Sequence, residues 1–393
     1  MPKTTSTIHQ GNALDILRTL PAESIQTCVT SPPYYGLRDY GTAQWSGGSK
    51  GCDHINTKGL QGRTGQRAGR THTQNDIYMS ICGKCGARRD DSQLGLEGTP
   101  GEYIEKMVAV FSEVYRVLKK DGSLWLNLGD SYYSTAAGTL SAPLKQKGIF
   151  ERVSDARANA SSSMRPAIPE GFKPKDLMGM PWRVAFALQE SGWYLRQDII
   201  WHKPNPMPES VKDRCTKAHE YIFLLSKSEK YYFDQNAILE PCSPNTHARI
   251  SQDVANQIGS DRDHAGAKSN VDRIPVTSKK TLEGDSTLGV KNNSSFARGT
   301  AGPVLERNKR SVWTVTTQPV KDAHFATYPE KLIEPCILAG SREGDMVLDP
   351  FSGSGTTGRV ALAFKRSYTG IELNPDYIKI SDRRTSNVPV ALF

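Results

Sequence analysis

The first block of the chain has helical and then strand-like spacing of apolar residues. Residues 13–20 have helical spacing, and SIQTCVT (24–30) indicates a strand that ends abruptly at SPPY. Farther along, one face of a predicted helix carries the apolar residues Ile104, Met107, Val108, Phe111, Val114, Tyr115 and Leu118. We expect Gly122 to end that helix, and SLWLNLGD (123–130) to follow as a strand. This order predicts a β-turn-α-β unit.

Two later blocks repeat the alternation of helices and strands. Residues 180–206 predict a helix, a strand and a loop, and HEYIFLLSKSEKYYFD (219–234) predicts a hairpin. Residues 345–373 predict a strand, a glycine-rich turn, a helix and a second strand. Because strands alternate with helices, the expected fold class is α/β, with a doubly wound and mostly parallel sheet.

Polar stretches rich in Gly, Ser or Arg separate these blocks, at residues 46–92, 134–176 and 238–310. They are long for loops of a compact domain, so we expect functional insertions or partly disordered segments. The 393 residues suffice for one large domain with insertions or for two domains.

Composition narrows the class of protein. No apolar run approaches the roughly 20 residues of a transmembrane helix, and the first residues lack an apolar signal core. We therefore expect no membrane contact and a cytoplasmic location. The net charge of +9 is compatible with nucleic acid as a partner, although charge alone is weak evidence. Seven cysteines in a reducing compartment indicate metal ligands before disulfides.

The sequence VLDPFSGSGTTG (347–358) places Asp349 at a strand end, Gly353 and Gly355 in a turn, and Thr356 at a helix start. Glycines permit close approach of a ligand, and open α/β sheets bind ligands at the carboxyl ends of strands. Glu372 ends the next strand, at the distance where an acidic residue commonly binds the two ribose hydroxyls. Because the turn has no P-loop lysine and no full dinucleotide pattern, a nucleoside without a polyphosphate fits better.

DPFSGSGTT (349–357) and TSPPY (30–34) together resemble the DNA amino-methyltransferases, which use S-adenosylmethionine. TSPPY precedes the glycine-rich motif, an order similar to the circularly permuted beta group of that family. Four other segments resemble further motifs of the group: HFATYPEKLIEPCILAGSREGDMVLDPF, GSLWLNLGDSYY, DIIWHKPNPMP and HEYIFLLSKS. One position departs from the pattern, because Asn12 stands where the family often has an acidic residue. The resemblance implies the S-adenosylmethionine-dependent methyltransferase fold, with the cofactor bound by Asp349, Pro350, Phe351, Gly353, Ser354, Gly355, Thr356, Glu372 and Asn374.

The resemblance also implies domain boundaries. Residues 1–237 would form the catalytic part of the methyltransferase domain, with insertions at 46–92 and 134–176, and residues 311–393 its cofactor-binding part. Residues 238–310 lie where the beta group usually has its target-recognition region, and a disordered linker is the alternative. In the first insertion, the arginines that could contact phosphate, or form a solvated surface, are Arg63, Arg67 and Arg70.

The residue types of SPPY suit methylation of an exocyclic amine. Such an amine is a weak nucleophile, because its lone pair is delocalised into the ring, and acceptors aimed at its N–H groups favour the reactive pyramidal form. Ser31 offers a hydroxyl oxygen and Pro32 a carbonyl, while Pro32 and Pro33 make the backbone rigid. Tyr34 can stack on a base rotated out of the duplex. The amine then attacks the activated methyl group directly.

The base that receives the methyl group follows from the first residue of the motif. Serine there resembles family members that methylate N4 of cytosine, whereas aspartate is typical of N6 of adenine, so cytosine N4 is expected and adenine N6 is the alternative. A cytosine C5 enzyme needs a Pro-Cys nucleophile after the glycine-rich motif, and Cys242 and Cys336 do not follow that order, so we interpret both cysteines as structural. From another class, the alternative is a zinc-containing DNA-binding module with an inactive methyltransferase core.

A cluster of metal-ligand residue types lies in the first insertion: Cys52, His54, Cys82 and Cys85. CGKC is typical of zinc turns, and CDH could complete a tetrahedral site with a folding role; free thiols and a surface histidine are the alternative. The resemblance implies double-stranded DNA as the partner, with a cognate restriction endonuclease and a second copy of the chain as further candidates. It also implies a cytoplasmic location in a bacterial cell or a phage-infected host.

Overall fold

The structure is a computed structural model that describes residues 4–36, 42, 44–49, 51–54, 81–90, 92–133, 172–242, 306–318, 328–386 and 388. The chain divides into two compact units, one formed by Met1–Ala237 with Arg310–Phe393 and the other by Ile238–Lys309. Arg63, Arg67 and Arg70, with residues 134–171 and 243–305, lie outside the described residues.

An eight-stranded sheet forms the centre of the larger unit, in the order β1-β12-β11-β2-β5-β7-β6-β10. Its strands are β1 (Ser6–Gln10), β2 (Ile25–Thr30), β5 (Leu118–Leu128), β6 (Tyr194–His202), β7 (His219–Ser226), β10 (Val312–Thr314), β11 (Met346–Asp349) and β12 (Ser367–Glu372). Among these strands, β7 alone runs antiparallel to its neighbours, β5 and β6. The prediction of a mostly parallel α/β sheet is confirmed.

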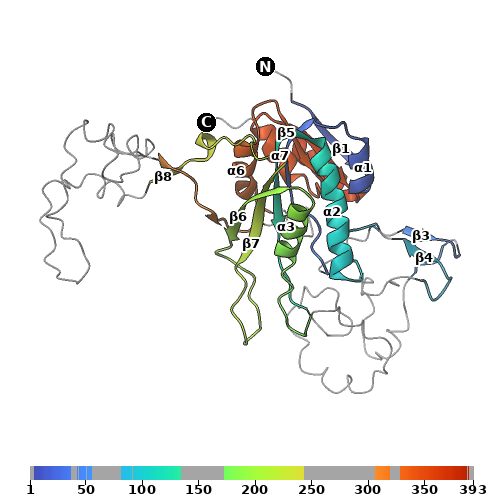
Figure 1. Ribbon diagram of the computed structural model, residues 1–393. Helices are drawn as coiled ribbons and strands as arrows, with labels where there is room; N and C mark the ends of the chain where they lie inside the picture. The colour runs from blue at the N-terminus through green and yellow to red at the C-terminus, as the bar shows by residue number, and fades with distance from the viewer. Residues whose placement is uncertain are drawn as a thin grey trace, which may run out of the picture. The chain divides into compact units, whose positions relative to one another are not determined.

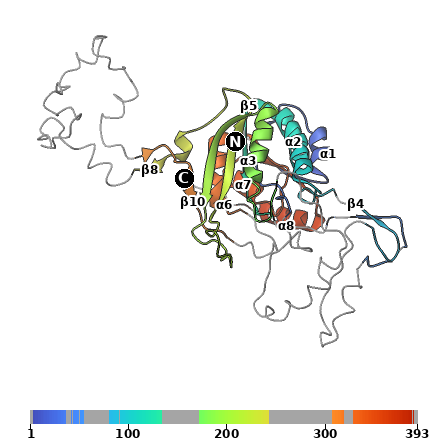
Figure 2. The ribbon, with the colours of Figure 1, turned by 60° about the horizontal axis from the view of Figure 1, so that its bottom comes forward.

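Helices cover both faces of this sheet (Figure 1, Figure 2). One face packs against α1 (Ala13–Thr19), α2 (Pro100–Val117) and α3 (Met180–Glu190), and the other against α6 (Glu330–Gly340), α7 (Thr356–Ala363) and α8 (Pro375–Thr385). The prediction that Gly122 ends the second helix is wrong, because α2 ends at Val117 and β5 begins at the next residue.

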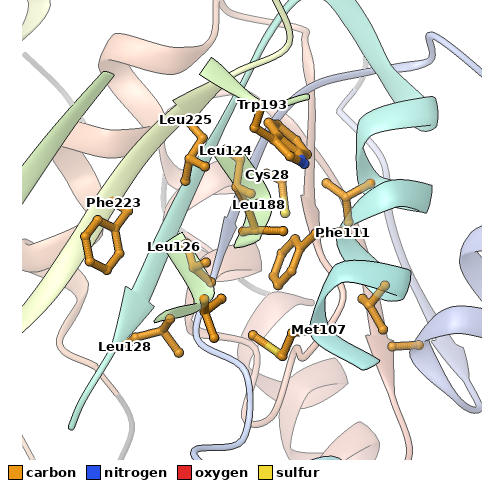
Figure 3. Packing of buried hydrophobic residues seen from close by; sticks show 14 of the residues in the cluster. Cys28, Met107, Phe111, Leu124, Leu126, Leu128, Leu188, Trp193, Phe223 and Leu225 are labelled. Atoms are coloured by element: carbon orange, nitrogen blue, oxygen red, sulfur yellow. The ribbon is translucent and has the colours of Figure 1, made fainter. Parts of the chain in front are cut away.

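The main apolar core lies between the sheet and the helices α2 and α3 (Figure 3). Leu124, Leu126 and Leu128 alternate along β5 toward this core, where Met107 and Phe111 of α2 are fully buried. Each such side chain contributes about 1.5–3 kcal/mol by its removal from water. This packing fixes β5, and with it the neighbouring β2 and the turn that follows β2.

The second block differs from its prediction. A hairpin was expected within residues 219–234, but β7 pairs with β5 along one edge and β6 along the other. Since neither edge of β7 is available, the residues after Ser226 leave the sheet, and the amide of Tyr232 donates to the carbonyl of Asp121 at 2.9 Å.

The remaining described elements are short. β3 (Gln44–Ser46) pairs antiparallel with β4 (Arg88–Asp90) in the larger unit, and β8 (Glu240–Pro241) pairs antiparallel with β9 (Glu306–Arg307) in the smaller one. A 3-10 helix spans Asn236–Ile238. Within the described ranges, every helix is too short or too polar to cross a membrane.

Candidate active site

A cavity of about 980 Å³ lies at the carboxyl ends of the central strands, and residues that follow β2, β11 and β12 line it. β2 and β11 are parallel neighbours, but the sheet continues from β2 to β5 on one side and from β11 to β12 on the other. Open α/β sheets bind ligands where the strand order reverses in this way. The two motifs that the sequence singled out therefore meet at one site.

The turn after β2 contributes four residues to the cavity wall: Ser31, Pro32, Pro33 and Tyr34. Oγ of Ser31 donates to Oη of Tyr34 at 3.3 Å, and Oη of Tyr34 donates to Oε2 of Glu220 at 2.7 Å. Burial, followed by the negative charge of Glu220, raises the pKa of Tyr34 well above its ordinary value of 10. The tyrosine hydroxyl thus stays protonated and remains a donor to the carboxylate.

Two strands supply polar partners of Tyr34 that the sequence analysis missed. Oδ1 of Asn127, on β5, lies 3.2 Å from Oη of Tyr34 and shares the single proton of that hydroxyl with Glu220, and Nδ2 of Asn127 donates to Glu220 at 3.3 Å. Lys203 forms an ion pair with the other oxygen of Glu220. The available signal was a polar residue near the end of one apolar strand, Asn127 in LWLNL, and another near the start of the next, Glu220 in HEYIFLL.

The backbone of the SPPY turn is also supported from α2 and β5. Oη of Tyr103 donates to the carbonyl of Pro33 at 2.9 Å. Gly129, directly after β5, contacts the ring of Tyr34 so closely that an added Cβ would lie 2.6 Å from Cε2 of that ring. The position of the tyrosine ring is therefore fixed on one side by glycine.

Six of the nine residues predicted to bind the cofactor line the cavity: Pro350, Phe351, Gly353, Ser354, Thr356 and Glu372. The other three lie behind the turn. Asp349 is 1% exposed, Gly355 packs on α8 with a φ of 77°, and Asn374 caps α8 by accepting from the amide of Asp376 at 2.9 Å. These three positions support the turn instead of lining its surface.

Glu372 is oriented by two backbone amides. Its Oε2 accepts from the amide of Gly353 at 2.8 Å, and its Oε1 accepts from the amide of Asn374 at 2.8 Å. Burial raises the pKa of Glu372 above its ordinary value of 4.5, and the two amide hydrogen bonds oppose that change. A carboxylate can accept about four hydrogen bonds, so Glu372 can accept from a further donor in the cavity.

Asp349 joins the two motifs. Its Oδ1 accepts from the hydroxyl of Thr30 at 2.6 Å and from the amide of Phe351 at 3.0 Å. Its Oδ2 accepts from the hydroxyls of Thr357 at 2.6 Å and Tyr328 at 3.1 Å. Burial raises the pKa of Asp349, and all four donors oppose the shift. The carboxylate links the end of β2 to the start of α7.

Arg384 of α8 is a second supporting residue that the sequence analysis missed. Its Nη1 donates to the carbonyl and the hydroxyl of Ser354 at 2.8 Å each, and to the hydroxyl of Thr356 at 3.2 Å. Beside Glu372, where the amide of Gly11 donates to the carbonyl of Glu372 at 3.0 Å, Asn12 lines the cavity and its Nδ2 donates to the carbonyl of Ser92 at 3.3 Å.

The candidate metal ligands also come together, outside the cavity. The ligand atoms of Cys52, His54, Cys82 and Cys85 all lie within 4.8 Å of one another, so this group could hold a metal ion. The amides of Ser49 and Ala87 hydrogen-bond to the sulfur of Cys85 and lower the pKa of its thiol to about 7.

Cys336, one of the two candidates for the single nucleophile of a C5 mechanism, is fully buried within α6. It does not line the described cavity, and its thiol points to the Leu332 carbonyl at 3.8 Å. These contacts agree with the structural interpretation of this cysteine.

Comparisons with known proteins agree on the family. The N6/N4 methyltransferase family model, described as DNA methylase, matches residues 25–383. The type II methyltransferase M.Cfr9I of Citrobacter freundii is 40% identical over 379 residues, which cover 96% of this chain and 87% of that protein. M.SmaI of Serratia marcescens, also a type II methyltransferase, is 37% identical over 374 residues, which cover 95% of this chain and 88% of that protein.

Among solved structures, the PvuII DNA methyltransferase (cytosine-N4-specific) matches with a TM-score of 0.51. The match covers 99% of this chain and 89% of that chain at 16% identity. A likeness at this identity shows the fold alone, and it agrees with the mixed sheet described above.

Proposed function

Because the chain belongs to the N6/N4 DNA methylase family and is a DNA methyltransferase, we propose that it methylates the exocyclic N4 amine of cytosine in double-stranded DNA, with S-adenosylmethionine as the methyl donor. One observation carries the proposal. The SPPY turn and the glycine-rich turn line the same cavity, and Thr30 and Asp349 join them by a hydrogen bond of 2.6 Å. A methyl donor and an amine acceptor can thus be bound side by side.

The residues around the glycine-rich turn fit a nucleoside cofactor. The free lone pairs of the Glu372 carboxylate can accept from the two ribose hydroxyls, while Phe351 and Leu373 offer apolar surface beside it. The Asn12 side chain, which follows β1 beside Glu372 and also lines the cavity, supplies a polar group without a second negative charge. When bound, S-adenosylmethionine supplies a methyl group that is already activated on a sulfonium.

The hydrogen bonds of the SPPY turn prepare Ser31 as an acceptor. The Ser31 hydroxyl donates a hydrogen bond to Oη of Tyr34, which in turn donates a hydrogen bond to Glu220. Both lone pairs of the Ser31 oxygen can therefore face the cavity. The carbonyl of Pro33 already accepts from Tyr103, which makes Pro32 the turn's proposed carbonyl acceptor. Acceptors fixed before the reaction stabilise positive charge as it develops on the amine.

The choice of cytosine as substrate rests on the first residue of the SPPY motif. Serine at this position resembles the cytosine-N4 members of the family, although the same acceptor geometry could serve adenine N6. The relatives that match nearly the whole chain are type II methyltransferases, so we propose that this enzyme protects DNA at a specific sequence beside a cognate restriction endonuclease. Residues 238–310 are the proposed target-recognition region, and the net charge of +9 supports contact with phosphates.

A methylome measurement tests this function. The chain is expressed in a bacterial strain without DNA methylation, and modified bases are mapped by a method that separates N4-methylcytosine from N6-methyladenine. We expect N4-methylcytosine at one short sequence. N6-methyladenine at a specific sequence would refute the base assignment, and an unmodified genome with folded, soluble protein present would refute the proposed reaction.

Two sets of variants test the residues. Ser31→Ala is expected to lower the methylation rate by about 10²–10³-fold, the usual effect of removing one preorganised polar group from an active site. Ser112→Ala, on the exposed face of α2, is the matched control and should leave the rate unchanged. Glu372→Ala should weaken S-adenosylmethionine binding in calorimetry, whereas Ser31→Ala should not; the reverse pattern would contradict the division into two subsites.

A further inference from the structure

The β3–β4 hairpin carries a cluster of four side chains that the methyl transfer does not use. Cys52 and His54 follow β3, and Cys82 and Cys85 precede β4. The Sγ atoms of Cys52 and Cys82 are 3.8 Å apart, and Nδ1 of His54 is 3.6 Å from Sγ of Cys85. All four cysteine and histidine ligand atoms lie within 4.8 Å of one another.

The distances of 3.8 Å and 3.6 Å match two edges of a zinc-centred tetrahedron. With Zn–S bonds of about 2.3 Å and Zn–N bonds of about 2.0–2.1 Å, two sulfurs are separated by about 3.8 Å, and a sulfur and a nitrogen by about 3.6 Å. The same sulfurs are too far apart for a disulfide, whose S–S bond is about 2.05 Å. Three thiols and one imidazole are the ligand set that Zn²⁺ takes in closed structural sites.

The surroundings of the cluster keep the ligands in place. The ring of His54 stacks on Trp45 of β3, with centroids 4.2 Å apart and planes inclined by 11°. Gly48 approaches Cys85 so closely that an added Cβ would lie 2.7 Å from the sulfur, and its φ is 72°. An imidazole oriented by a neighbouring group is a common feature of metal sites.

We propose that Cys52, His54, Cys82 and Cys85 bind one Zn²⁺ ion, which stabilises the β3–β4 hairpin as a structural site of this methyltransferase. Each strand has only three residues, and a two-stranded hairpin of that size has little stability of its own. The metal would supply the missing folding free energy. All four ligands come from the protein, so the ion has no open position for chemistry.

The place of the hairpin in the chain gives the metal a consequence for the active site. β3 follows the SPPY turn along the chain, and β4 leads directly to Ser92, Gln93 and Leu94, which line the cavity. The amide of Gly36 donates to the carbonyl of Gly95 at 2.8 Å and joins the two ends. The zinc site therefore stabilises an insertion whose ends form part of the cavity wall.

Metal analysis of the full-length protein tests the proposal. Protein purified under reducing conditions without added metal should contain near-stoichiometric zinc, and Cys85→Ser should lose it. Cys215→Ser, which changes an exposed cysteine outside the cluster, is the control and should keep it. Chelation should lower the Tm of the wild type, and Zn²⁺ should restore it. Retained zinc in Cys85→Ser together with an unchanged Tm after chelation would overturn the structural role.

A second measurement does not depend on whether the variant folds. The chelated wild-type protein is titrated with Co²⁺, and the visible absorption of tetrahedral cobalt with thiolate ligands should appear and saturate at one equivalent. Zn²⁺ should displace it. An apoprotein that shows no saturable Co²⁺ or Zn²⁺ binding while it remains folded would overturn the site. Neither readout requires methylation, so the result is independent of the proposed reaction.

Discussion

Substitution of Gly355 by alanine tests how the glycine-rich turn is supported. Gly355 has a φ of 77°, which costs an alanine about 1–2 kcal/mol. The new Cβ would lie 3.0 Å from Cα of Ser381 and closer still to the serine hydroxyl, so crowding adds about 1–3 kcal/mol. We expect the free energy of unfolding to fall by about 2–5 kcal/mol, within the roughly 5–15 kcal/mol of a typical domain.

The same change should weaken cofactor binding, because Ser354 and Thr356 on either side of Gly355 line the cavity. Each 1.4 kcal/mol that the cofactor must spend to restore the turn lowers its affinity about tenfold. Urea denaturation measures the loss of stability, and calorimetry measures the dissociation constant of S-adenosylmethionine.

Two further variants separate backbone strain from crowding. Gly101 lies at the exposed start of α2, where the nearest atom to a new Cβ is 3.8 Å away. Gly101→Ala is therefore the control, and it should leave the free energy of unfolding unchanged or raise it by up to about 1 kcal/mol. Ser381→Ala removes the nearest oxygen, so the Gly355→Ala, Ser381→Ala double variant should recover part of the crowding cost and none of the φ cost. Wild-type stability and cofactor affinity in Gly355→Ala would refute this reasoning.

Three other predictions concern the walls of the cavity. Tyr34→Phe keeps the ring but removes the hydrogen bond from Ser31, which contributes about 0.5–1.5 kcal/mol. Single-turnover methylation should therefore slow by about 2- to 12-fold without a change in DNA affinity. An unchanged rate would show that Ser31 needs no orientation by Tyr34. Gly129→Ala would place a Cβ 2.6 Å from the Tyr34 ring, and should lower the methylation rate while calorimetry shows unchanged cofactor binding. Burial raises the pKa of Glu372 above 4.5, and binding to ribose hydroxyls requires the ionised form, so cofactor affinity should fall as the pH drops through that raised pKa. A Glu372→Gln variant should lose this pH dependence; if it titrates like the wild type, another group is responsible.

The sequence predicted those parts of the molecule that depend on neighbours along the chain. The apolar spacing of residues 102–118 indicated α2, and the order of strands and helices indicated the mostly parallel sheet, which the structure confirms. The boundary at Gly122 was wrong because β5 starts immediately after α2. The hairpin expected in residues 219–234 was wrong because β5 and β6 already occupy both edges of β7.

Contacts between distant segments could not be predicted in the same way. Glu220 lies 186 positions after Tyr34, and no local pattern pairs a carboxylate at the start of one strand with a hydroxyl beyond the end of another. Arg384 likewise reaches Ser354 across 30 positions from a helix whose own sequence is polar. The sequence could identify the turns of the site, and only the packed sheet identifies the residues that support them.

Asp349 illustrates how the permuted order of motifs still produces one site. Thr30 and Asp349 are 319 positions apart in the chain, yet β2 and β11 are parallel neighbours and end side by side. A buried carboxylate is costly unless donors surround it, and here Thr30, Thr357, Tyr328 and the Phe351 amide all donate. Removal of the carboxylate would leave these donors without their shared acceptor, and would weaken the link between the SPPY turn and the glycine-rich turn that the β2–β11 pairing also maintains. Because the Asp349 side chain lies behind the cavity wall, we propose that it is a positioning residue, and that the spacing between methyl donor and target amine would depend on it.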